Sequence, residues 1–349
     1  MIILKEAIIV TEKFLIGTYT KKTSQGIYGV TLDSEQASLS PVWLVAKSGK
    51  PAYLQVLNDH LYSVKQIGDE GGVASYVLQG DQAELLKTNL SVVAPPAYVA
   101  VDQARSLLYS ANYHAGTVTV YHINDDQSLT QTDEVKHSGV TGPRPEQDNP
   151  HAHYADLTPD HRLVVCDLGL DQTIVYDVSE NGQLTFVSTY QHEAGFGTRH
   201  LTFSPDGKVA YVLGELSSQL EVLKYDANTG SFEHLQTIKT IPDDWTAHNG
   251  AAAIHISSDG KYVYTSNRGE NTLAVFAVQD DSTVKHIQSI STEGDFPRDF
   301  DLSKNEDFLV ASNQESDNLT LYARDPETGL LTLLQKDVAC PEPVCVKQW

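Results

Sequence analysis

The stretch RHLTFSPDGKVAYVLGE, from Arg199 to Glu215, is repeated in frame by AAIHISSDGKYVYTSNR, from Ala252 to Arg268. Both stretches alternate apolar and polar residues, turn at Ser-x-Asp-Gly-Lys, and then alternate again. Such alternation around a short Asp-Gly turn is typical of a β-hairpin. The two middles are nearly the same and the ends differ, which indicates one repeated scaffold that carries different chemistry at its ends.

The same turn recurs along the whole chain. When the sequence is aligned on Asp206, equivalent turns are expected near Glu12, Asp59, Ala104, Asp160, Asp259 and Asn305, which makes seven units with a spacing of 45 to 56 residues. Each unit then offers a second pair of short strands, such as NTLAVFAV and KHIQSI around the turn DDST. Four strands per unit in seven units predict an all-β protein, a seven-bladed β-propeller with four antiparallel strands per blade.

The two ends of the chain are expected to meet in one blade. The tail PEPVCVKQW, residues 341–349, resembles the opening of a unit such as PAYLQVL at Pro51, while the first unit, KFLIGTYT, lacks that opening strand. We therefore expect the C-terminal strand to complete the first blade and close the ring. Residues 1–349 are expected to form a single propeller domain, with residues 1–11 as an N-terminal extension or edge strand.

The composition limits the partners and the compartment. The chain of 349 residues has 46 acidic and 24 basic residues and a formal net charge of −22, which argues against nucleic acid or an anionic membrane as a partner. It has no apolar run of about 20 residues that could span a membrane. Three sparse cysteines and the absence of a signal-peptide pattern indicate a reducing, cytoplasmic location. We expect a monomer or a weak homodimer.

The hairpin geometry predicts which residues share one site. The first strand of a hairpin starts where the second strand ends, so these positions ring one mouth of the central channel. Residues seven before the turn position are Ala97, His153, Arg199, Ala252 and Arg298; residues nine after it are Tyr113, Gly169, Glu215, Arg268 and Gln314. Polar neighbours of these positions are Asn112, Asn267, Asn313, His151, His200 and His248.

Three arginines at one mouth predict an anionic ligand, because they repel one another unless an anion or a carboxylate lies among them. Guanidinium groups bind phosphate or carboxylate and stabilise an oxyanion, and a nearby Glu or His can take a proton from water. This set suits hydrolysis of an anionic ester or lactone without a metal or a covalent nucleophile. Alternatively, the polar residues only hold water in the channel, and Arg199–Glu215 is a structural ion pair.

Metal and cofactor signals are weak. His151 and His153 lie on one side of a strand and could bind zinc, but no third ligand is evident. The sequence contains no His-Glu-x-x-His helix, Walker loop or Gly-x-Ser-x-Gly elbow. We therefore predict neither a metal nor a cofactor.

Several phrases of the chain resemble a known family. They are DNPHAHYADLTPD, GTRHLTFSPDGKVAYVLGELSS, AAAIHISSDGKYVYTSNRGENTLAVF and FLVASNQESDNLTLYARDPETG. These are similar to the seven-bladed lactonase family, which includes bacterial propeller-type 6-phosphogluconolactonases and fungal carboxy-muconate cyclases. The resemblance implies a metal-independent enzyme whose site consists of His153, Arg199, Glu215 and Arg268. In the phrase Pro297-Arg298-Asp299-Phe300, Asp299 places a carboxylate beside Arg298 that would weaken phosphate binding.

The sequence therefore predicts a lactone hydrolase acting on 6-phospho-D-gluconolactone. Arg199 and Arg268 would hold the anionic group or the developing oxyanion, and Glu215 or His153 would be the general base. The expected substrate-binding residues are Arg298, His200, Asn267, Tyr113, His151, His248 and Gln314. Two alternatives stay open: a cyclase-like lactonising enzyme acting on a muconate-type acid, and a non-catalytic propeller that binds a protein or metabolite.

Overall fold

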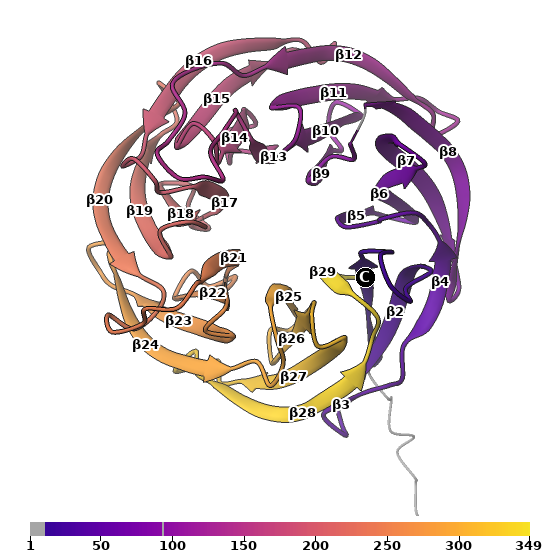
Figure 1. The fold of residues 1–349 in the computed structure, drawn as a ribbon, viewed down its shortest axis with the longest axis vertical. Coiled ribbons are helices and arrows are strands. Elements are labelled where there is room, and N and C mark those ends of the chain that lie inside the picture. The colour runs from indigo at the N-terminus through magenta and orange to yellow at the C-terminus, as the bar shows by residue number, and fades with distance from the viewer. Residues whose placement is uncertain (1–10, 93) are drawn as a thin grey trace, which may run out of the picture.

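Seven antiparallel sheets surround a central axis (Figure 1). The computed structural model describes residues 11–92 and 94–349, and this part of the chain forms the 29 strands of these sheets. The predicted seven-bladed propeller is confirmed, with one variation. In the first blade, β3 and β4 both pair with β2, so that the outer strand of this blade is divided in two. Of the N-terminal extension expected at residues 1–11, residues 1–10 lie outside the described residues, and Thr11 begins β1.

The blades follow one another in chain order, and each runs from an inner strand at the axis to an outer strand. Blade 1 consists of β29 (Pro343–Gln348), β1 (Thr11–Thr18), β2 (Gly26–Asp33), β3 (Ser38–Leu39) and β4 (Trp43–Lys47). Blade 2 consists of β5 (Leu54–Leu57), β6 (His60–Ile67), β7 (Glu70–Gln79) and β8 (Gln82–Val92). Blade 3 consists of β9 (Tyr98–Asp102), β10 (Leu107–Asn112), β11 (Thr117–Ile123) and β12 (Leu129–Lys136). Blade 4 consists of β13 (Ala152–Leu157), β14 (Leu163–Asp167), β15 (Gln172–Val178) and β16 (Leu184–Gln191). Blade 5 consists of β17 (Thr198–Phe203), β18 (Val209–Gly214), β19 (Gln219–Asp226) and β20 (Ser231–Lys239). Blade 6 consists of β21 (Gly250–Ile256), β22 (Tyr262–Arg268), β23 (Thr272–Val278) and β24 (Val284–Ser291). Blade 7 consists of β25 (Pro297–Leu302), β26 (Phe308–Asn313), β27 (Asn318–Arg324) and β28 (Leu331–Ala339).

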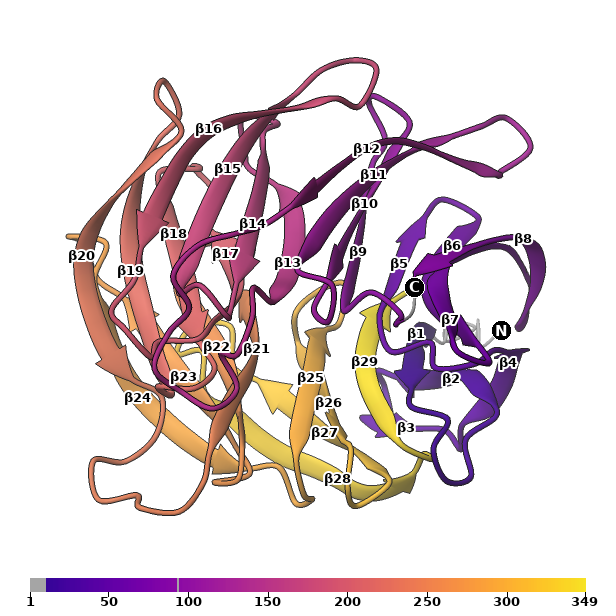
Figure 2. The same ribbon diagram turned by 45° about the horizontal axis from the view of Figure 1, so that its top comes forward.

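The C-terminal strand closes the ring, as predicted. β29 is the inner strand of blade 1 and pairs with β1 in antiparallel register, with Ile16 opposite Val346 (Figures 1 and 2). Blade 7 holds the other edge of β29, because Asp299 and Asp301 accept hydrogen bonds from the backbone N–H groups of Val346 and Gln348, both at 2.9 Å. The strand is therefore bound on both sides, which protects its edge from other chains.

The repeated Asp-Gly turn forms for a local reason. Gly207 and Gly260 adopt positive φ angles of 71° and 73°, a backbone conformation that favours glycine. In each turn the glycine N–H donates to the serine carbonyl three residues earlier at 2.8 Å, and the Asp carboxylate accepts from the serine hydroxyl. The turn predicted near Glu12 is wrong. Glu12 lies within β1, because the inner strand of blade 1 comes from the other end of the chain and no hairpin turn joins the two.

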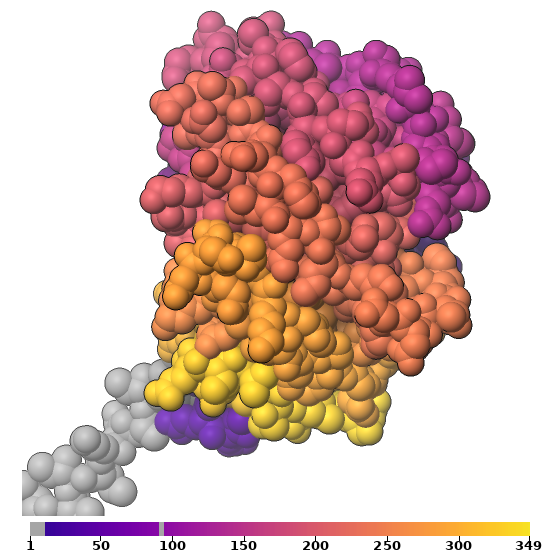
Figure 3. Space-filling model, turned by 90° about the vertical axis from the view of Figure 1, so that its left-hand side faces the viewer, coloured from indigo at the N-terminus to yellow at the C-terminus, as the bar shows by residue number. Residues whose placement is uncertain are grey.

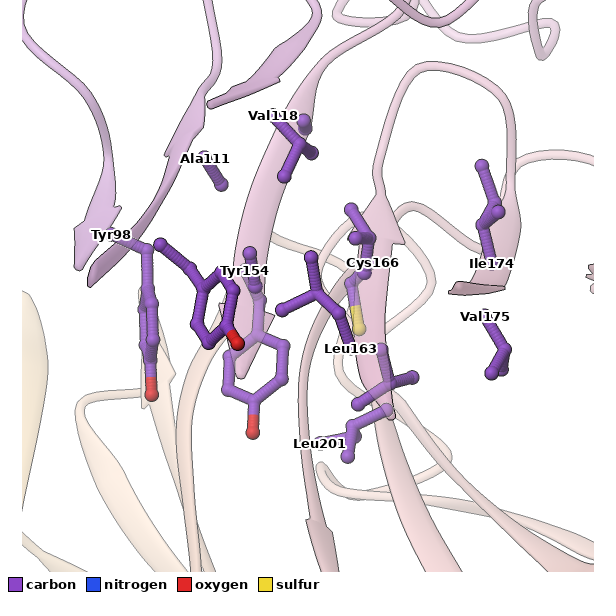
Figure 4. Packing of buried hydrophobic residues seen from close by; sticks show 14 of the residues in the cluster. Tyr98, Ala111, Val118, Tyr154, Leu163, Cys166, Ile174, Val175 and Leu201 are labelled. Atoms are coloured by element: carbon purple, nitrogen blue, oxygen red, sulfur yellow. The ribbon is translucent and has the colours of Figure 1, made fainter. Parts of the chain in front are cut away.

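Burial decreases from the inner strands to the outer strands. Every residue of β14 is buried, whereas β16, in the same blade, has only exposed and half-buried residues. Apolar side chains of neighbouring blades interlock between the sheets, and Figure 4 shows Tyr98 and Tyr154 of adjacent inner strands in one such layer. The outer strands form the wall of the ring, along which successive blades follow from magenta to yellow in Figure 3.

Cys166, Cys340 and Cys345 are buried and unpaired. Within the described residues, no helix combines the length and apolarity that crossing a bilayer requires.

Candidate functional site

A polar cavity of about 220 Å³ opens at the end of the channel opposite the Asp-Gly turns. Residues from six blades and the connections between them contribute to its wall. Its lining includes seven of the positions given by the hairpin rule, together with the predicted neighbour His200. The seven are Ala97, Tyr113, His153, Arg199, Glu215, Arg268 and Arg298. The hairpin rule therefore brings together side chains that are up to 201 residues apart in the chain.

Bulges in the inner strands aim three of these side chains at the channel. The antiparallel register shifts at His153 in β13, at Arg199 in β17 and at Arg298 in β25, where one residue of the inner strand has no partner in the second strand. A bulge bends its strand and re-aims a side chain, and bulges are common next to active sites. The same irregularity recurs at the same distance from each turn, so three blades deliver a side chain to the same cavity.

Glu215 holds two arginines in place. Its carboxylate oxygens form ion pairs of 2.8 Å with Nε of Arg199, in the same blade, and with Nη2 of Arg268, in the next blade. Burial raises the pKa of the Glu215 carboxyl, but Arg268 and Arg199 outweigh this effect and hold the pKa below its ordinary value. Glu215 is therefore ionised at neutral pH and is a weak base.

Backbone carbonyls complete the support of the guanidinium groups. Arg199 Nη1 donates to the carbonyl of Ala252, and Arg268 Nε donates to that of Gly250 at 3.1 Å. A guanidinium has five N–H donors, and within the described residues Arg199 Nη2 and Arg268 Nη1 have no hydrogen-bond acceptor. Both arginines line the cavity, so these N–H groups can serve a ligand.

Two buried imidazoles lie next to the arginines. His153 Nδ1 and His200 Nε2 are 3.2 Å apart, so one ring donates a hydrogen bond to the other. Burial and then the positive charges of Arg199, Arg298 and Arg268 hold the pKa of His153 well below its ordinary value, and burial and Arg199 do the same to His200. Both rings are therefore neutral at pH 7, and His153 can accept a proton.

Aromatic rings form the floor of the cavity. Tyr98 packs between Tyr53 and Tyr154 in tilted contacts, with ring centroids 4.2 and 4.6 Å away, and His200 meets Tyr98 edge to face at 5.4 Å. Tyr98 also donates a hydrogen bond of 2.9 Å to the buried Asp156. This layer fixes His200, and through it the ring of His153.

Asp299 interacts with β29 rather than with the neighbouring Arg298. Its carboxylate lines the cavity but accepts the backbone N–H of Val346, and His255 lies 3.9 Å from its other oxygen. Within the described residues it forms no ion pair with Arg298.

The other residues predicted from the sequence lie in different environments. His248 lines an adjoining hollow that shares Glu215 and Arg268 with the cavity. His151 packs behind the wall, stacked on Tyr113 at 4.1 Å. Gln314 donates to Glu315, and Gly169 packs against the backbone of Asn149. None of the four lines the main cavity, and neither does Asn267.

Asn267 joins blades. Its side-chain amide donates to the carbonyl of Thr240 at 2.9 Å and its oxygen accepts from the Thr240 hydroxyl at 2.8 Å. Asn112 and Asn313 make the equivalent bond to the preceding blade, to Ala94 and Thr292. This repeated contact explains why an asparagine recurs at the end of the second strand.

The sequence matches the seven-bladed β-propeller lactonases over residues 13–348. The chain belongs to this family. The lactonase propeller is 42% identical over 339 residues to the 6-phosphogluconolactonase of Bacillus subtilis strain 168, a match that covers 95% of this chain and 97% of that protein. A crystal structure of a protein from Lactobacillus plantarum is 58% identical, with a TM-score of 0.96 and coverage of 97% and 100%. The periplasmic gluconolactonase PpgL of Pseudomonas aeruginosa is 29% identical, with a TM-score of 0.91 and coverage of 97% and 99%.

Sequence reasoning missed four polar residues of the cavity: Tyr19, Lys50, Tyr53 and His114. Tyr19 directly follows β1, as Tyr113 follows β10 and Glu215 follows β18. Counting from the end of the second strand, rather than from the turn, would have found it. Lys50 lies in the connection between blades 1 and 2, which the hairpin rule does not sample.

The two histidines of the His-Ala-His motif have different partners. His151 hydrogen-bonds to the carbonyl of Tyr113 and to Asp148, at 2.7 and 2.9 Å, whereas His153 faces His200. The two rings are engaged separately. In the described part of the chain, no group of three or more His, Cys, Asp or Glu side chains is arranged to hold a metal ion.

Proposed function

We propose that this lactonase propeller is a metal-independent hydrolase that opens 6-phospho-D-glucono-1,5-lactone to 6-phosphogluconate. The charge of the cavity carries the proposal. Its wall holds four cationic side chains against two carboxylates, in a chain whose formal net charge is −22. The cations are Lys50, Arg199, Arg268 and Arg298, and the carboxylates are Glu215 and Asp299. The excess of two positive charges matches a phosphate dianion, and the name of the Bacillus subtilis relative supports this substrate.

His153 acts as the general base. Its imidazole is buried, neutral and part of the cavity wall, and His200 fixes its orientation through the 3.2 Å contact. A positioned base of this kind contributes a factor of about 10² to 10⁴ to the rate. The low pKa weakens the base in the empty site, and the negative charge of a bound phosphate counteracts the arginines that lower it.

Arg199 and Arg268 stabilise the oxyanion. Each has an N–H group without an acceptor in the described residues, and Glu215 and the backbone carbonyls fix both guanidinium planes before the substrate arrives. Preorganised donors aimed at developing charge are worth about 10² to 10³ in rate each. Glu215 is a positioning residue in this scheme, because its two carboxylate oxygens are engaged by the guanidinium groups of Arg199 and Arg268.

The reaction balances without a metal or a covalent intermediate. His153 takes a proton from water as the water oxygen forms a bond to the lactone carbonyl carbon. The tetrahedral oxyanion then collapses and the bond from this carbon to the ring oxygen breaks. The imidazolium returns its proton to the departing alkoxide, and the new carboxylic acid releases its proton to solvent. We also propose that the protein works in the cytoplasm as a monomer or a weak homodimer.

The test follows the proton that lactone opening releases. Wild type is assayed with 6-phosphogluconolactone at neutral pH in the presence of a chelator, with the uncatalysed rate subtracted. We expect turnover by wild type and a loss of about 10² to 10⁴ in kcat for His153→Gln. His122→Gln, which changes a half-buried histidine outside the cavity, is the matched control and should retain activity.

Three outcomes would overturn the proposal. Loss of turnover with chelator would contradict metal independence. Turnover of an unsaturated diacid in place of the lactone would favour the lactonising cyclase. Binding of 6-phosphogluconate without any acceleration of lactone opening would favour a non-catalytic binding propeller.

A further inference from the structure

Two cations of the cavity have no carboxylate partner. Glu215 pairs with Arg199 and Arg268, and the Asp299 carboxylate is taken by the backbone of β29. Within residues 11–92 and 94–349, neither Lys50 nor Arg298 forms an ion pair. Unpaired cations facing a cavity are unusual in a chain with nearly twice as many acidic as basic residues. Both residues are half-buried, so each has lost part of its hydration, and an anionic ligand can supply the missing partner.

Both cations lie against one tyrosine ring. The guanidinium carbon of Arg298 is 5.3 Å from the centre of the Tyr19 ring, and Lys50 Nζ is 6.0 Å from it. Tyr19 follows β1, Lys50 lies between β4 and β5, and Arg298 is in the bulge of β25. These three residues come from blade 7, blade 1 and the connection between blades 1 and 2, whereas His153, Arg199 and Arg268 come from blades 4, 5 and 6, across the ring (Figure 1). The cavity therefore has two cationic sides.

The backbone holds this second side in place. Lys50 adopts a left-handed conformation with φ 49°, its N–H donates to the Thr20 hydroxyl at 3.0 Å, and its carbonyl accepts from Ala52 at 2.8 Å. The Tyr19 N–H donates to the carbonyl of Glu342 at 3.1 Å. This left-handed backbone and its two hydrogen bonds fix the direction in which the Lys50 side chain leaves the connection. The site is thus built before any ligand binds.

We propose that Tyr19, Lys50 and Arg298 form a phosphate subsite, which selects phosphorylated lactones over plain ones. This inference rests on the proposed lactone hydrolysis. Arg298 offers a guanidinium fork for two phosphate oxygens, Lys50 a compact positive charge, and Tyr19 a hydroxyl that has no acceptor within the described residues. Although burial raises the pKa of Tyr19, Arg298, Lys21 and Lys50 outweigh it and lower this pKa, which makes the hydroxyl a stronger donor.

With this subsite, the two sides of the cavity bind different parts of the substrate. The lactone carbonyl lies with His153, Arg199 and Arg268, and the phosphate at the other end of the sugar lies with Lys50 and Arg298. The binding energy of the phosphate then orients the reacting carbon, although the phosphate itself does not react.

The experiment compares two lactones. Lys50→Met and Tyr19→Phe remove a charge and a hydroxyl with little change of shape. We expect Lys50→Met to lower kcat/KM for 6-phosphogluconolactone about 10- to 100-fold, mainly through KM, and to leave kcat/KM for unphosphorylated glucono-1,5-lactone within about twofold. Tyr19→Phe should act in the same direction with a smaller loss. Lys47→Met is the matched control: Lys47 is an exposed lysine of β4 that lies outside the cavity, so both lactones should be unaffected within about twofold.

Each other result has a definite meaning. Equal losses on both lactones, or no loss on the phosphorylated one, would overturn the subsite. If wild type opens neither lactone, the proposed function fails, and calorimetry with 6-phosphogluconate, gluconate and inorganic phosphate decides on the subsite alone. If Lys50→Met binds 6-phosphogluconate about tenfold more weakly than wild type and binds gluconate equally well, the result supports the subsite. If wild type and Lys50→Met bind 6-phosphogluconate equally, the result overturns the subsite. Inorganic phosphate binding as tightly as 6-phosphogluconate would show that free phosphate, rather than a phosphosugar, is the ligand.

Discussion

Glu215 and Arg268 form an ion pair of 2.8 Å that joins two neighbouring blades, because Glu215 follows β18 and Arg268 ends β22. The second carboxylate oxygen forms an equal contact with Arg199 in its own blade. One acidic side chain thus fixes two guanidinium groups whose mutual repulsion would otherwise separate them. The arrangement makes Glu215 a structural centre of the cavity, which separates its role from that of His153.

Glu215→Gln should lower both activity and stability without removing the base. The amide cannot neutralise Arg199 and Arg268, so we expect a loss of about 3 kcal/mol in the free energy of unfolding, measured with urea. Misplaced guanidinium groups should reduce kcat about 100-fold. The acid limb of the pH–rate profile should persist in this variant, because His153 still titrates. Disappearance of that limb in Glu215→Gln would make Glu215 the base. Glu270→Gln, which alters a nearby carboxylate outside both hollows, should change kcat less than about twofold.

The pH dependence should report a histidine that stays neutral in acid. His153 must be unprotonated to act, and burial, Arg199 and Arg298 hold its pKa well below its ordinary value of 6.5. We therefore expect kcat/KM for unphosphorylated gluconolactone to stay constant as the pH falls through 6.5 and to decline only at lower pH. The plain lactone is used because a phosphate ionises near pH ~6.

Arg298→Gln should move that acid limb to higher pH, since it removes one of the charges that depress the pKa of His153. Lys21→Met, outside the cavity, should leave the limb in place. An acid limb that does not respond to Arg298→Gln would contradict His153 as the titrating group.

Asn267→Ala should affect stability more than catalysis. Asn267 bonds twice to Thr240 of the preceding blade, and its loss leaves buried polar groups unsatisfied. We expect a loss of about 2 kcal/mol in the free energy of unfolding and a change in kcat/KM below about threefold. Asn313→Ala removes the equivalent contact to Thr292 and should behave alike. A large rise in KM for Asn267→Ala, without such a rise for Asn313→Ala, would show that Asn267 binds the substrate.

Glu342→Gln should loosen the closure of the ring. The buried carboxylate of Glu342 accepts four backbone N–H groups from residues 21–24, at 2.8 to 3.1 Å, and thereby ties the C-terminal segment to the loop after β1. In the glutamine variant, an NH₂ group would replace one carboxylate oxygen and could not accept a hydrogen bond from these backbone N–H groups. We therefore expect the free energy of unfolding, measured by heat or urea, to fall by about 3 kcal/mol. Glu315→Gln, which affects an exposed ion pair with Lys22 and an exposed hydrogen bond from Gln314, should cost less than about 1 kcal/mol. Equal losses in the two variants would contradict this role of Glu342.

The sequence predicted the architecture and much of the cavity, because both depend on local spacing. Each hairpin returns to the same rim, and the bulges at His153, Arg199 and Arg298 occur at a constant distance from the turn. Counting residues from the hairpin turn fails in blade 1, where the arrangement of strands differs. Blade 1 has no hairpin turn at Glu12, so the equivalent of Glu215 in that blade, Tyr19, was not recognised.

Other residues escape prediction because spacing does not give side-chain direction. The spacing of the repeat predicts that Asn267 and Gln314 lie at the channel mouth. In the structure, the Asn267 side chain bonds to the neighbouring blade and the Gln314 side chain bonds to Glu315. The orientation of Asp299 depends on β29, which comes from the opposite end of the sequence from β1. Lys50 belongs to a connection outside any repeat, and only its left-handed backbone and the shape of the ring bring it to Tyr19.

A crystal structure of the protein with 6-phosphogluconate tests the central claim most directly. We expect the product in the cavity, with its carboxylate within about 3 Å of N–H groups of Arg199 and Arg268 and its phosphate in contact with Lys50 and Arg298. Electron density for the product at another surface of the propeller, with this cavity holding only solvent, would contradict the account.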